Sequence, residues 1–174
     1  PEHRKAVVMA WKELIEKRVY KGEMEMPDVL GGTATAAIPW AAFLAYEMNL
    51  PMVYIRPQKK EHGAGKQIEG DLQPGQKVLI VEDLISTGGS SVAAAKAVRE
   101  EGKCEVTDIF AIVSWELAKA EALFADAGLR LTNLTGFTAL ISLAAENGAI
   151  KAEDEAVVME FKKDPPTWAD RVGL

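Results

Sequence analysis

Residues 78–91, with the sequence VLIVEDLISTGGSS, constrain the fold more than any other stretch of this chain. Four β-favouring apolar residues lead into Glu82 and Asp83, and a turn rich in Ser, Thr and Gly follows before a helical pattern begins. A run that is apolar on both faces is typical of a central parallel strand. Ligands bind at the carboxyl ends of such strands, and a turn that leads into a helix can direct backbone N–H groups at an anion. The stretch therefore predicts an anion site with two carboxylates beside it.

The bulk composition fits one globular domain. The chain has 174 residues, of which 48% are hydrophobic and 26% charged, and this suits a single good core. The net charge of −6 argues against a nucleic-acid surface, and no apolar run approaches the ~20 residues that a membrane span requires. A single cysteine, Cys104, excludes an internal disulfide and fits a reducing compartment such as the cytoplasm. With His3 and His62 as the two histidines, a histidine-rich metal site is not expected.

Strand and helix patterns alternate along the chain. We expect helices over residues 3–20, 39–49, 90–101, 117–127, 138–147 and 152–163. In addition to the strand that begins at Val78, we expect strands over residues 28–32, 50–56, 106–114 and 129–134. This alternation predicts one α/β domain spanning residues 1–174, with a central, mainly parallel sheet flanked by helices and right-handed crossovers.

Propensity and spacing predict several local features. Ser90 or Ser91 can cap the helix that follows the turn. Ile38, Ala42, Ala45 and Met48 share the helical face that we expect against the sheet. The two prolines at 165–166 are expected to stop the last helix, because proline cannot continue one. The large aromatic residues are expected in the core or an interface rather than as stacking platforms for a base: Trp11, Trp40, Trp115 and Phe137.

The turn after the opening strand has the composition of a phosphate-binding site. Small residues let backbone N–H groups approach a ligand, and hydroxyls add donors. The residues concerned are Ser86, Thr87, Gly88, Gly89 and Ser90. No Gly-Lys-Ser/Thr follows, so the turn is not a P-loop. Glu82 and Asp83 repel a phosphate but accept hydrogen bonds from sugar hydroxyls, so a ribose 5-phosphate fits both parts. The plain alternative is that the acids end the strand and the glycines merely turn it.

Two segments upstream add to this interpretation. Residues 57–70 are charged, contain glycines and lack apolar periodicity, which predicts a long mobile loop. The plain alternative for its basic residues is a solvated surface. Residues 32–37 are small, and their N–H groups, with the hydroxyls of Thr33 and Thr35, can bind a diphosphate. The alternative there is a tight turn from strand to helix.

Residues 78–91 closely resemble the diphosphoribosyl-binding signature of the type I phosphoribosyltransferases, which is a hydrophobic run, two acidic residues and a Thr/Ser/Gly turn. Among these proteins, the sequence RPQKKEHG at 56–63, followed by QIEG at 67–70, resembles the loop of the orotate phosphoribosyltransferases. Its Lys-x-His-Gly element is the more discriminating part. The sequence GTATAAIP at 32–39 resembles the pyrophosphate loop of that family. The resemblance covers nearly the whole chain.

The resemblance implies the type I phosphoribosyltransferase fold and a specific reaction. Ribose 5-phosphate passes from phosphoribosyl diphosphate to orotate, which gives orotidine 5'-monophosphate and pyrophosphate in pyrimidine biosynthesis. The resemblance also implies Mg2+ carried by the diphosphate without protein ligands, and a homodimer whose mobile loop acts in the neighbouring subunit's site. The implied catalytic residues are Lys60, His62, Glu82 and Asp83. The implied substrate-binding residues are Arg56, Lys59, Thr33, Ala34, Thr35, Ser86, Thr87, Gly88, Gly89 and Ser90.

Some features depart from the family pattern. Pro57 and Ala36 stand where some members have lysine, and no arginine for the orotate carboxylate is evident at residues 115–120. The chain starts at Pro1 without a methionine and directly in a helical pattern. We therefore expect the natural start, and with it the family's N-terminal hood over orotate, to lie upstream. Two alternatives stay open: a phosphoribosyltransferase for a purine or another base, and a non-catalytic regulator of the same fold that binds phosphoribosyl diphosphate.

Overall fold

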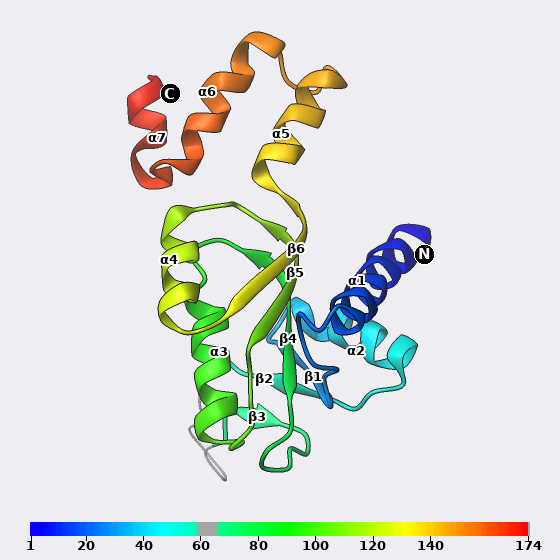
Figure 1. The fold of residues 1–174 in the computed structure, drawn as a ribbon. Helices are drawn as coiled ribbons and strands as arrows, with labels where there is room; N and C mark the ends of the chain where they lie inside the picture. Colours follow the sequence, from blue (N-terminus) through cyan, green and yellow to red (C-terminus); the bar gives the residue numbers. More distant parts are fainter. Residues whose placement is uncertain (59–65, 174) are drawn as a thin grey trace.

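The computed structural model describes residues 1–58 and 66–173. Within these residues, six strands form one sheet in the order β3-β2-β1-β4-β5-β6 (Figure 1). Neighbouring strands are parallel, except that β3 pairs with β2 in the antiparallel direction. The strands are β1 (Val29–Thr33), β2 (Met52–Ile55), β3 (Ile68–Glu69), β4 (Val78–Ile85), β5 (Asp108–Ser114) and β6 (Arg130–Gly136). The predicted α/β fold with a mainly parallel sheet is confirmed.

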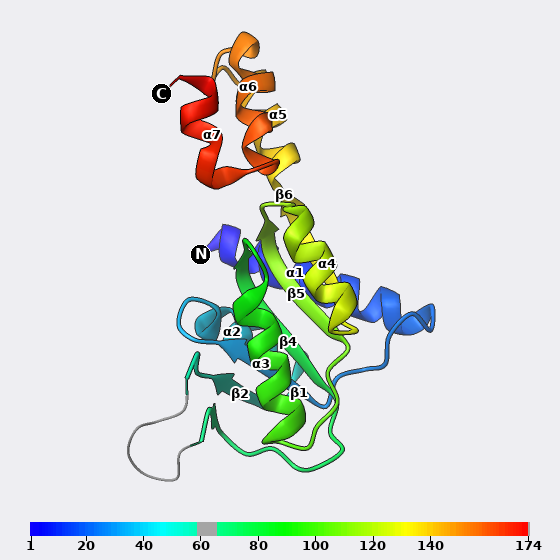
Figure 2. The same ribbon diagram turned by 90° about the vertical axis from the view of Figure 1, so that its left-hand side faces the viewer.

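Helices cover both faces of this sheet. The first four are α1 (Glu2–Tyr20), α2 (Ala37–Met48), α3 (Gly89–Glu100) and α4 (Ala118–Asp126). Helices α1 and α2 pack on one face, and α3 and α4 pack on the other (Figures 1 and 2). The last helices are α5 (Phe137–Glu146), α6 (Glu155–Met159) and α7 (Pro165–Val172), with short 3-10 helices η1 (Ala152–Asp154) and η2 (Glu160–Lys162) between them. This C-terminal unit, residues 137–172, extends from the end of β6 beyond the carboxyl edge of the sheet (Figure 1).

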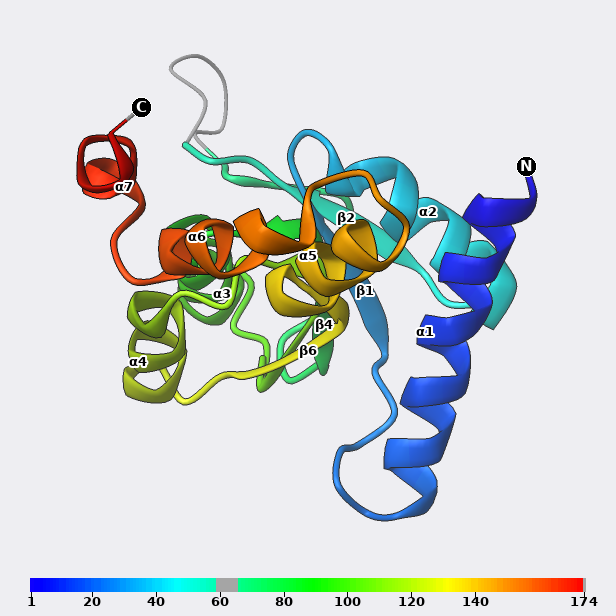
Figure 3. The ribbon, with the colours of Figure 1, turned by 90° about the horizontal axis from the view of Figure 1, so that it is seen from above.

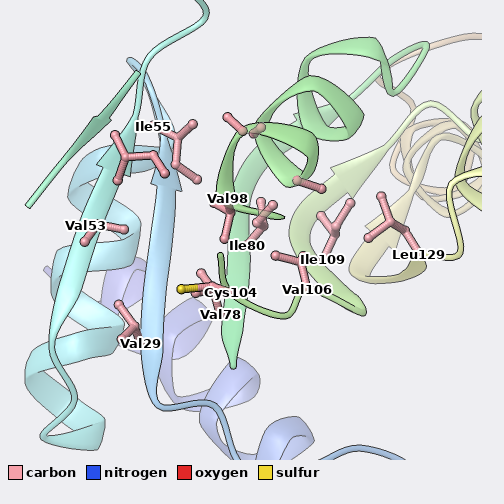
Figure 4. Packing of buried hydrophobic residues seen from close by; sticks show 14 of the residues in the cluster. Val29, Val53, Ile55, Val78, Ile80, Val98, Cys104, Val106, Ile109 and Leu129 are labelled. Carbon is pink, nitrogen blue, oxygen red and sulfur yellow. The ribbon is translucent and has the colours of Figure 1, made fainter. Parts of the chain in front are cut away.

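The core consists of two hydrophobic clusters, one on each face of the sheet. Because successive side chains of a strand point to opposite faces, Val78 and Ile80 of β4 enter the cluster beneath α3 and α4, which Figure 4 shows. Leu79 and Val81 enter the other cluster, together with Trp11 of α1. All four β4 side chains are buried. The continuous apolar run is therefore explained by burial on both faces, as expected for a central parallel strand.

The order of the strands places a switch point between β1 and β4. From β1 the chain moves outward to β2 and then returns to β4 on the other side of β1. In open α/β sheets, the carboxyl edge at such a point is where ligands bind. Thr33, the last residue of β1, lies there and donates a hydrogen bond to Glu82 of β4. The fold thus brings the small-residue segment at 32–37 and the turn at 86–90 to the same edge of the sheet.

Two of the local predictions are wrong, one of them only in part. The buried face of α2 consists of Ala37, Ala41, Leu44 and Ala45. Of the predicted face, Ala45 is therefore buried and Met48 packs against the core, whereas Ile38 and Ala42 are half-buried. This helix is apolar nearly all round, so periodicity does not select a face. The buried face of α2 is selected instead by its close approach to the sheet, because a Cβ at Gly32 of β1 would lie 2.8 Å from the Cβ of Ala41.

The serine cap of α3 is also a wrong prediction. Gly88 occupies the N-cap position in a left-handed conformation, and no side chain caps the helix. Ser90 is exposed, and the fully buried Ser91 donates its hydroxyl to Glu82 instead.

Two elements of the structure, α7 and β3, were not predicted from the sequence. The prolines at 165–166 begin α7 rather than ending all helical structure, because proline is tolerated in the first turn of a helix. The two-residue edge strand β3 was not expected either. Finally, no helix in the described parts of the chain has the length and apolar character needed to cross a membrane.

Candidate active site

The phosphate turn, residues 86–90, joins β4 to α3 at the carboxyl edge of the sheet. Gly88 adopts φ 78° and ψ −3°, and a Cβ there would lie 2.9 Å from Cζ of Phe124, so conformation and space both require glycine. The N–H of Val92 bonds to the Gly88 carbonyl at 3.1 Å, so the first-turn N–H groups before Val92 have no carbonyl partner within the helix. Thr87, Gly89 and Ser90 are exposed. The turn is therefore an open site for an anion at a helix N-terminus.

Glu82 and Asp83 differ in their surroundings. Glu82 is 4% exposed, and its Oε1 accepts a hydrogen bond from Ser91 Oγ at 2.6 Å. Its Oε2 accepts a hydrogen bond from Thr33 Oγ1. Burial raises the pKa of Glu82, and these two hydrogen bonds counteract the shift in part. Glu82 thus connects β1, β4 and the first turn of α3, and Asp83, which is half-buried, is the more accessible carboxylate.

The segment after β1 forms the second wall of the site. Ala34 donates its N–H to the Ile55 carbonyl at 2.8 Å, and the Ala34–Thr35 peptide bond is cis. Thr35 is exposed, whereas Thr33 is buried and its hydroxyl is used by Glu82. A hollow of about 450 Å³ lies here, and its lining residues are Ala34, Thr35, Ile38, Tyr54, Arg56, Pro57 and Gln58. The two predicted diphosphate residues Thr35 and Arg56 therefore meet at one hollow.

Hydrogen bonds hold Arg56 at the rim of this hollow. Its Nε lies 3.0 Å from Glu69 Oε1, and its second terminal nitrogen donates to Tyr54 Oη at 3.3 Å. Gln67 pairs with Arg56 through both backbones and through its own side chain, and its N–H also donates to the Glu101 carboxylate at 3.0 Å. These contacts fix the two flanks of the predicted loop. The remaining predicted loop residues, Lys59, Lys60 and His62, lie outside the described residues.

The sequence did not single out Glu116, which follows β5. Glu116 has φ 55°, and its carboxylate bonds to Thr138 of α5 and Lys162 of η2. The preceding residue, Trp115, donates its N–H to the carbonyl of Ile85 at 2.8 Å, immediately before the phosphate turn. No motif marks Glu116, because its partners are distant in the sequence.

The predicted structural role of the large aromatic residues fits their packing. Trp11 is fully buried, donates to the Ala111 carbonyl at 3.3 Å and meets Trp40 edge-on. Trp115, which follows β5, packs against Phe161 and so joins the C-terminal unit to the sheet, whereas Phe137 packs against Phe161 within that unit. Among the residues that the structure describes, no group of three or more His, Cys, Asp or Glu side chains is arranged to hold a metal ion.

Similarity to known proteins identifies the family. The phosphoribosyl transferase domain matches residues 2–122. The orotate phosphoribosyltransferase of Streptococcus gordonii is 49% identical over 152 residues, which cover 86% of this chain and 72% of that protein. This chain belongs to the orotate phosphoribosyltransferase family. The orotate phosphoribosyltransferase of Lactococcus lactis subsp. lactis is 44% identical over 168 residues, 97% of this chain and 78% of that protein.

The fold agrees with this family. The crystal structure of orotate phosphoribosyltransferase from Aeropyrum pernix has a TM-score of 0.62 and 26% sequence identity, over 82% of this chain and 78% of that one. The matched domain, residues 2–122, includes the segment after β1, the phosphate turn and both acidic residues of β4. The C-terminal unit lies beyond that match. The candidate site at the switch point therefore lies within the part of the chain that matches the phosphoribosyl transferase domain.

Proposed function

We propose that this chain transfers ribose 5-phosphate from phosphoribosyl diphosphate to orotate, with orotidine 5'-monophosphate and pyrophosphate as products. The observation that carries the proposal is the open phosphate turn at the switch point, on the strand that also bears Glu82 and Asp83. An anion cradle beside carboxylates fits a phosphorylated sugar. Membership of the orotate phosphoribosyltransferase family supports the choice of orotate as acceptor.

Three parts of the edge take three parts of the donor substrate. The first-turn N–H groups of α3 and the hydroxyls of Ser86, Thr87 and Ser90 bind the 5-phosphate. Asp83 accepts hydrogen bonds from the ribose hydroxyls, and Glu82 holds the strand and the turn in register. The hollow beside Thr35 and Arg56 takes the diphosphate. In this arrangement the anomeric carbon lies between the diphosphate and the space in front of β5.

The chemistry needs opposite charges on the two sides of the anomeric carbon. The bond to the diphosphate oxygen breaks ahead of the new bond to the base nitrogen, so the ring becomes oxocarbenium-like. The carboxylate of Asp83 stabilises the positive ring and accepts hydrogen bonds from its hydroxyls, and the buried Glu82 holds the strand that bears Asp83. Positive charge from Arg56, Lys59, Lys60 and His62 stabilises the leaving pyrophosphate. The electron pair of the broken bond stays on pyrophosphate, which can also accept the proton that the base nitrogen loses.

Magnesium is part of the proposal. A hard divalent cation takes phosphate oxygens with few protein ligands, so Mg2+ would be held by the diphosphate and would offset its negative charge. Both oxygens of Glu82 already accept hydrogen bonds, which leaves the half-buried Asp83 as the carboxylate suited to the ion's water shell. We further propose a homodimer in which residues 57–70 act in the neighbouring copy's site, in the cytoplasm, where the lone Cys104 stays reduced.

The direct test is the loss of orotate absorbance. Purified protein with Mg2+ and phosphoribosyl diphosphate should consume orotate, and adenine as a competing base should not be consumed. Unchanged orotate absorbance would overturn the proposal, and preferential consumption of adenine would reassign the acceptor base.

Two variants test the roles of individual residues. Asp83→Asn should cut kcat/KM for phosphoribosyl diphosphate by ~100-fold, in the range of a lost charge-stabilising group, while Asp126→Asn, on the exposed end of α4, serves as the matched control. Lys60→Ala should lower kcat by a similar factor of about 100 and leave the fold intact, with the exposed Lys96→Ala as its control. Near-normal turnover in either site variant would remove that residue from the mechanism.

A further inference from the structure

The C-terminal unit joins the rest of the molecule at one junction. The chain passes from β6 into α5 at Gly136, and the unit then lies over the carboxyl edge of the sheet (Figure 1). Seen from above, α5 and α6 project over the ends of the strands and over α3 (Figure 3). The orientation of this unit therefore determines what bounds the site on the side away from the sheet.

One carboxylate connects three segments at this junction. Glu116, from the loop between β5 and α4, accepts hydrogen bonds from the N–H of Thr138 at 3.0 Å and from the Thr138 hydroxyl. Lys162 of η2 donates to the same oxygen, Oε2, at 3.0 Å. Because Thr138 lies in the first turn of α5, Glu116 acts as an N-cap supplied by another part of the chain.

The backbone around Glu116 is adapted to hold this carboxylate. Its φ of 55° is a left-handed conformation that side chains rarely adopt, and its N–H donates to Ser114 Oγ at 3.0 Å. A Cβ at Gly136 would lie 2.0 Å from Glu116 Oε1, so glycine leaves the space that the carboxylate fills. Partial burial disfavours the charged form, but the hydrogen bonds from Thr138 and Lys162 outweigh it and lower the pKa of Glu116. The carboxylate is thus charged at neutral pH.

The same loop is bonded to the end of β4, immediately before the phosphate turn. The N–H of Trp115 bonds to the Ile85 carbonyl at 2.8 Å, and the next residue after Ile85 opens the turn. On its other side, the Trp115 ring packs against Phe161, with 5.3 Å between ring centroids. Two adjacent residues, Trp115 and Glu116, therefore contact the C-terminal unit and the end of β4 just before the phosphate turn.

We propose that Glu116 is a positioning residue that holds the C-terminal unit in one orientation beside the phosphate turn and so shapes the acceptor side of the site. The inference rests on the function proposed above. The diphosphate hollow lies beside β1 and β2, whereas Glu116 follows β5 on the other side of β4. Since the base attacks the anomeric carbon from the side opposite the leaving diphosphate, the base approaches from the side of β5 and the C-terminal unit.

The first experiment compares Glu116→Ala and Glu116→Gln with Glu121→Ala. Glu121 is exposed, and together with Glu116 it lines a second hollow, which lies beside the end of β5. Hydrogen exchange of the Thr138 amide should rise about tenfold in Glu116→Ala, as expected when a charged acceptor at a helix cap is lost. Glu116→Gln keeps an acceptor oxygen but loses the charge, so a rise of about threefold is expected. Exchange of the β4 amides should stay unchanged in all three variants.

The same variants are then measured in turnover. KM for orotate should rise by about tenfold in Glu116→Ala, while KM for phosphoribosyl diphosphate changes less than about twofold, in line with a lost interaction of ordinary size on the acceptor side. Equal rises in both KM values, or a fall of kcat alone with normal Thr138 exchange, would overturn the proposal. If the wild-type protein consumes no orotate, the proposed function fails, and Thr138 exchange still decides whether Glu116 holds the unit.

A second variant reaches the same carboxylate from the opposite side. Gly136→Ala places a methyl group where Glu116 Oε1 lies and changes no charge. It should reproduce the Glu116→Ala effects on Thr138 exchange and on KM for orotate. In the Glu116→Ala background, however, Gly136→Ala should add less than about twofold, because the two changes act on one contact. Full additivity of the two changes would show that Glu116 is not the contact through which Gly136 acts.

Discussion

The sheet with its four flanking helices and the C-terminal unit are stabilised in different ways. The sheet buries side chains on both faces, and residues such as Trp11, Leu30 and Ile80 have no exposed surface. In contrast, α5, α6 and α7 contain no buried residue, and Leu140 and Leu143 of α5 are 47% and 55% exposed. The unit is held by an aromatic cluster around Phe161 and by the polar contacts of Glu116. Burial therefore stabilises the sheet, whereas a few specific contacts orient the unit.

The largest difference between the two regions should appear on truncating a leucine. Leu30→Ala in β1 should lower the free energy of unfolding by about 2–5 kcal/mol, because it leaves a cavity in a packed core. Leu143→Ala in α5 should change it by less than about 0.5 kcal/mol, since that side chain is more than half exposed. Urea unfolding followed by circular dichroism measures both. Similar losses for the two variants would mean that the unit is as well packed as the sheet.

A pair of glycines separates backbone strain from packing. Gly88 and Gly148 both have positive φ, but a Cβ at Gly88 would strike Phe124, whereas one at Gly148 would meet nothing within 4 Å. Gly88→Ala should destabilise the fold by about 2–4 kcal/mol, from conformational cost plus overpacking. Gly148→Ala should cost about 1 kcal/mol from conformation alone. Thermal unfolding of the two variants is the measurement, and equal costs would show that the contact with Phe124 does not matter.

The aromatic cluster should control the unit without controlling the sheet. Phe161 packs on Trp115, Phe137 and Trp168, with ring centroids 5.3, 5.6 and 5.8 Å away. Phe161→Ala should make local opening of α5–α7 easier by about 1–3 kcal/mol, because several aromatic contacts are lost together. Hydrogen exchange should report this in the unit and leave β4 protected. Leu140→Ala, a partly exposed residue of α5, serves as the control, and equal loosening of β4 would contradict the separation of the two regions.

The smallest expected effect concerns the pH dependence of stability. Burial raises the pKa of Glu82 above its unfolded value, so the folded state binds that proton more tightly. Ionisation of Glu82 therefore costs stability: the cost is absent below the unfolded pKa, grows as the pH rises to the folded pKa, and is complete above it. Glu82→Gln should remove this decline with rising pH, measured as unfolding midpoints from pH 4 to pH 8.

Glu116 should show the opposite sign. The pKa of Glu116 is lowered, so its ionised carboxylate stabilises the folded state. This contribution to the free energy of unfolding is present above the unfolded pKa and is lost as the pH falls through the folded pKa. The matched control for both carboxylates is Glu121→Gln, on an exposed surface. If Glu82→Gln and Glu121→Gln gave the same pH dependence as the wild-type protein, the buried carboxylate of Glu82 would have no thermodynamic effect.

Local sequence was sufficient for the elements of the site. The run at 78–91 predicted a strand, a turn and a helix, and the structure has β4, the phosphate turn and α3 in this order. What local sequence could not assign was the partner of each polar group. Ser91 satisfies the pattern of a helix cap, yet its hydroxyl reaches Glu82 because β4 lies beside the first turn of α3. The roles of Lys60 and His62 stay predictions.

The sequence by itself therefore determined the α/β class, the order of the elements and the chemistry of the stretch at 78–91, because these depend on residues close together in the chain. The tertiary structure alone decided that Thr33 and Ser91 share Glu82, and that Glu116 meets Thr138 and Lys162. These partners are separated by up to 49 residues, as in the contact of Thr33 with Glu82. Periodicity and propensity act over a few residues, whereas burial of a carboxylate selects whichever donors the folded sheet brings near.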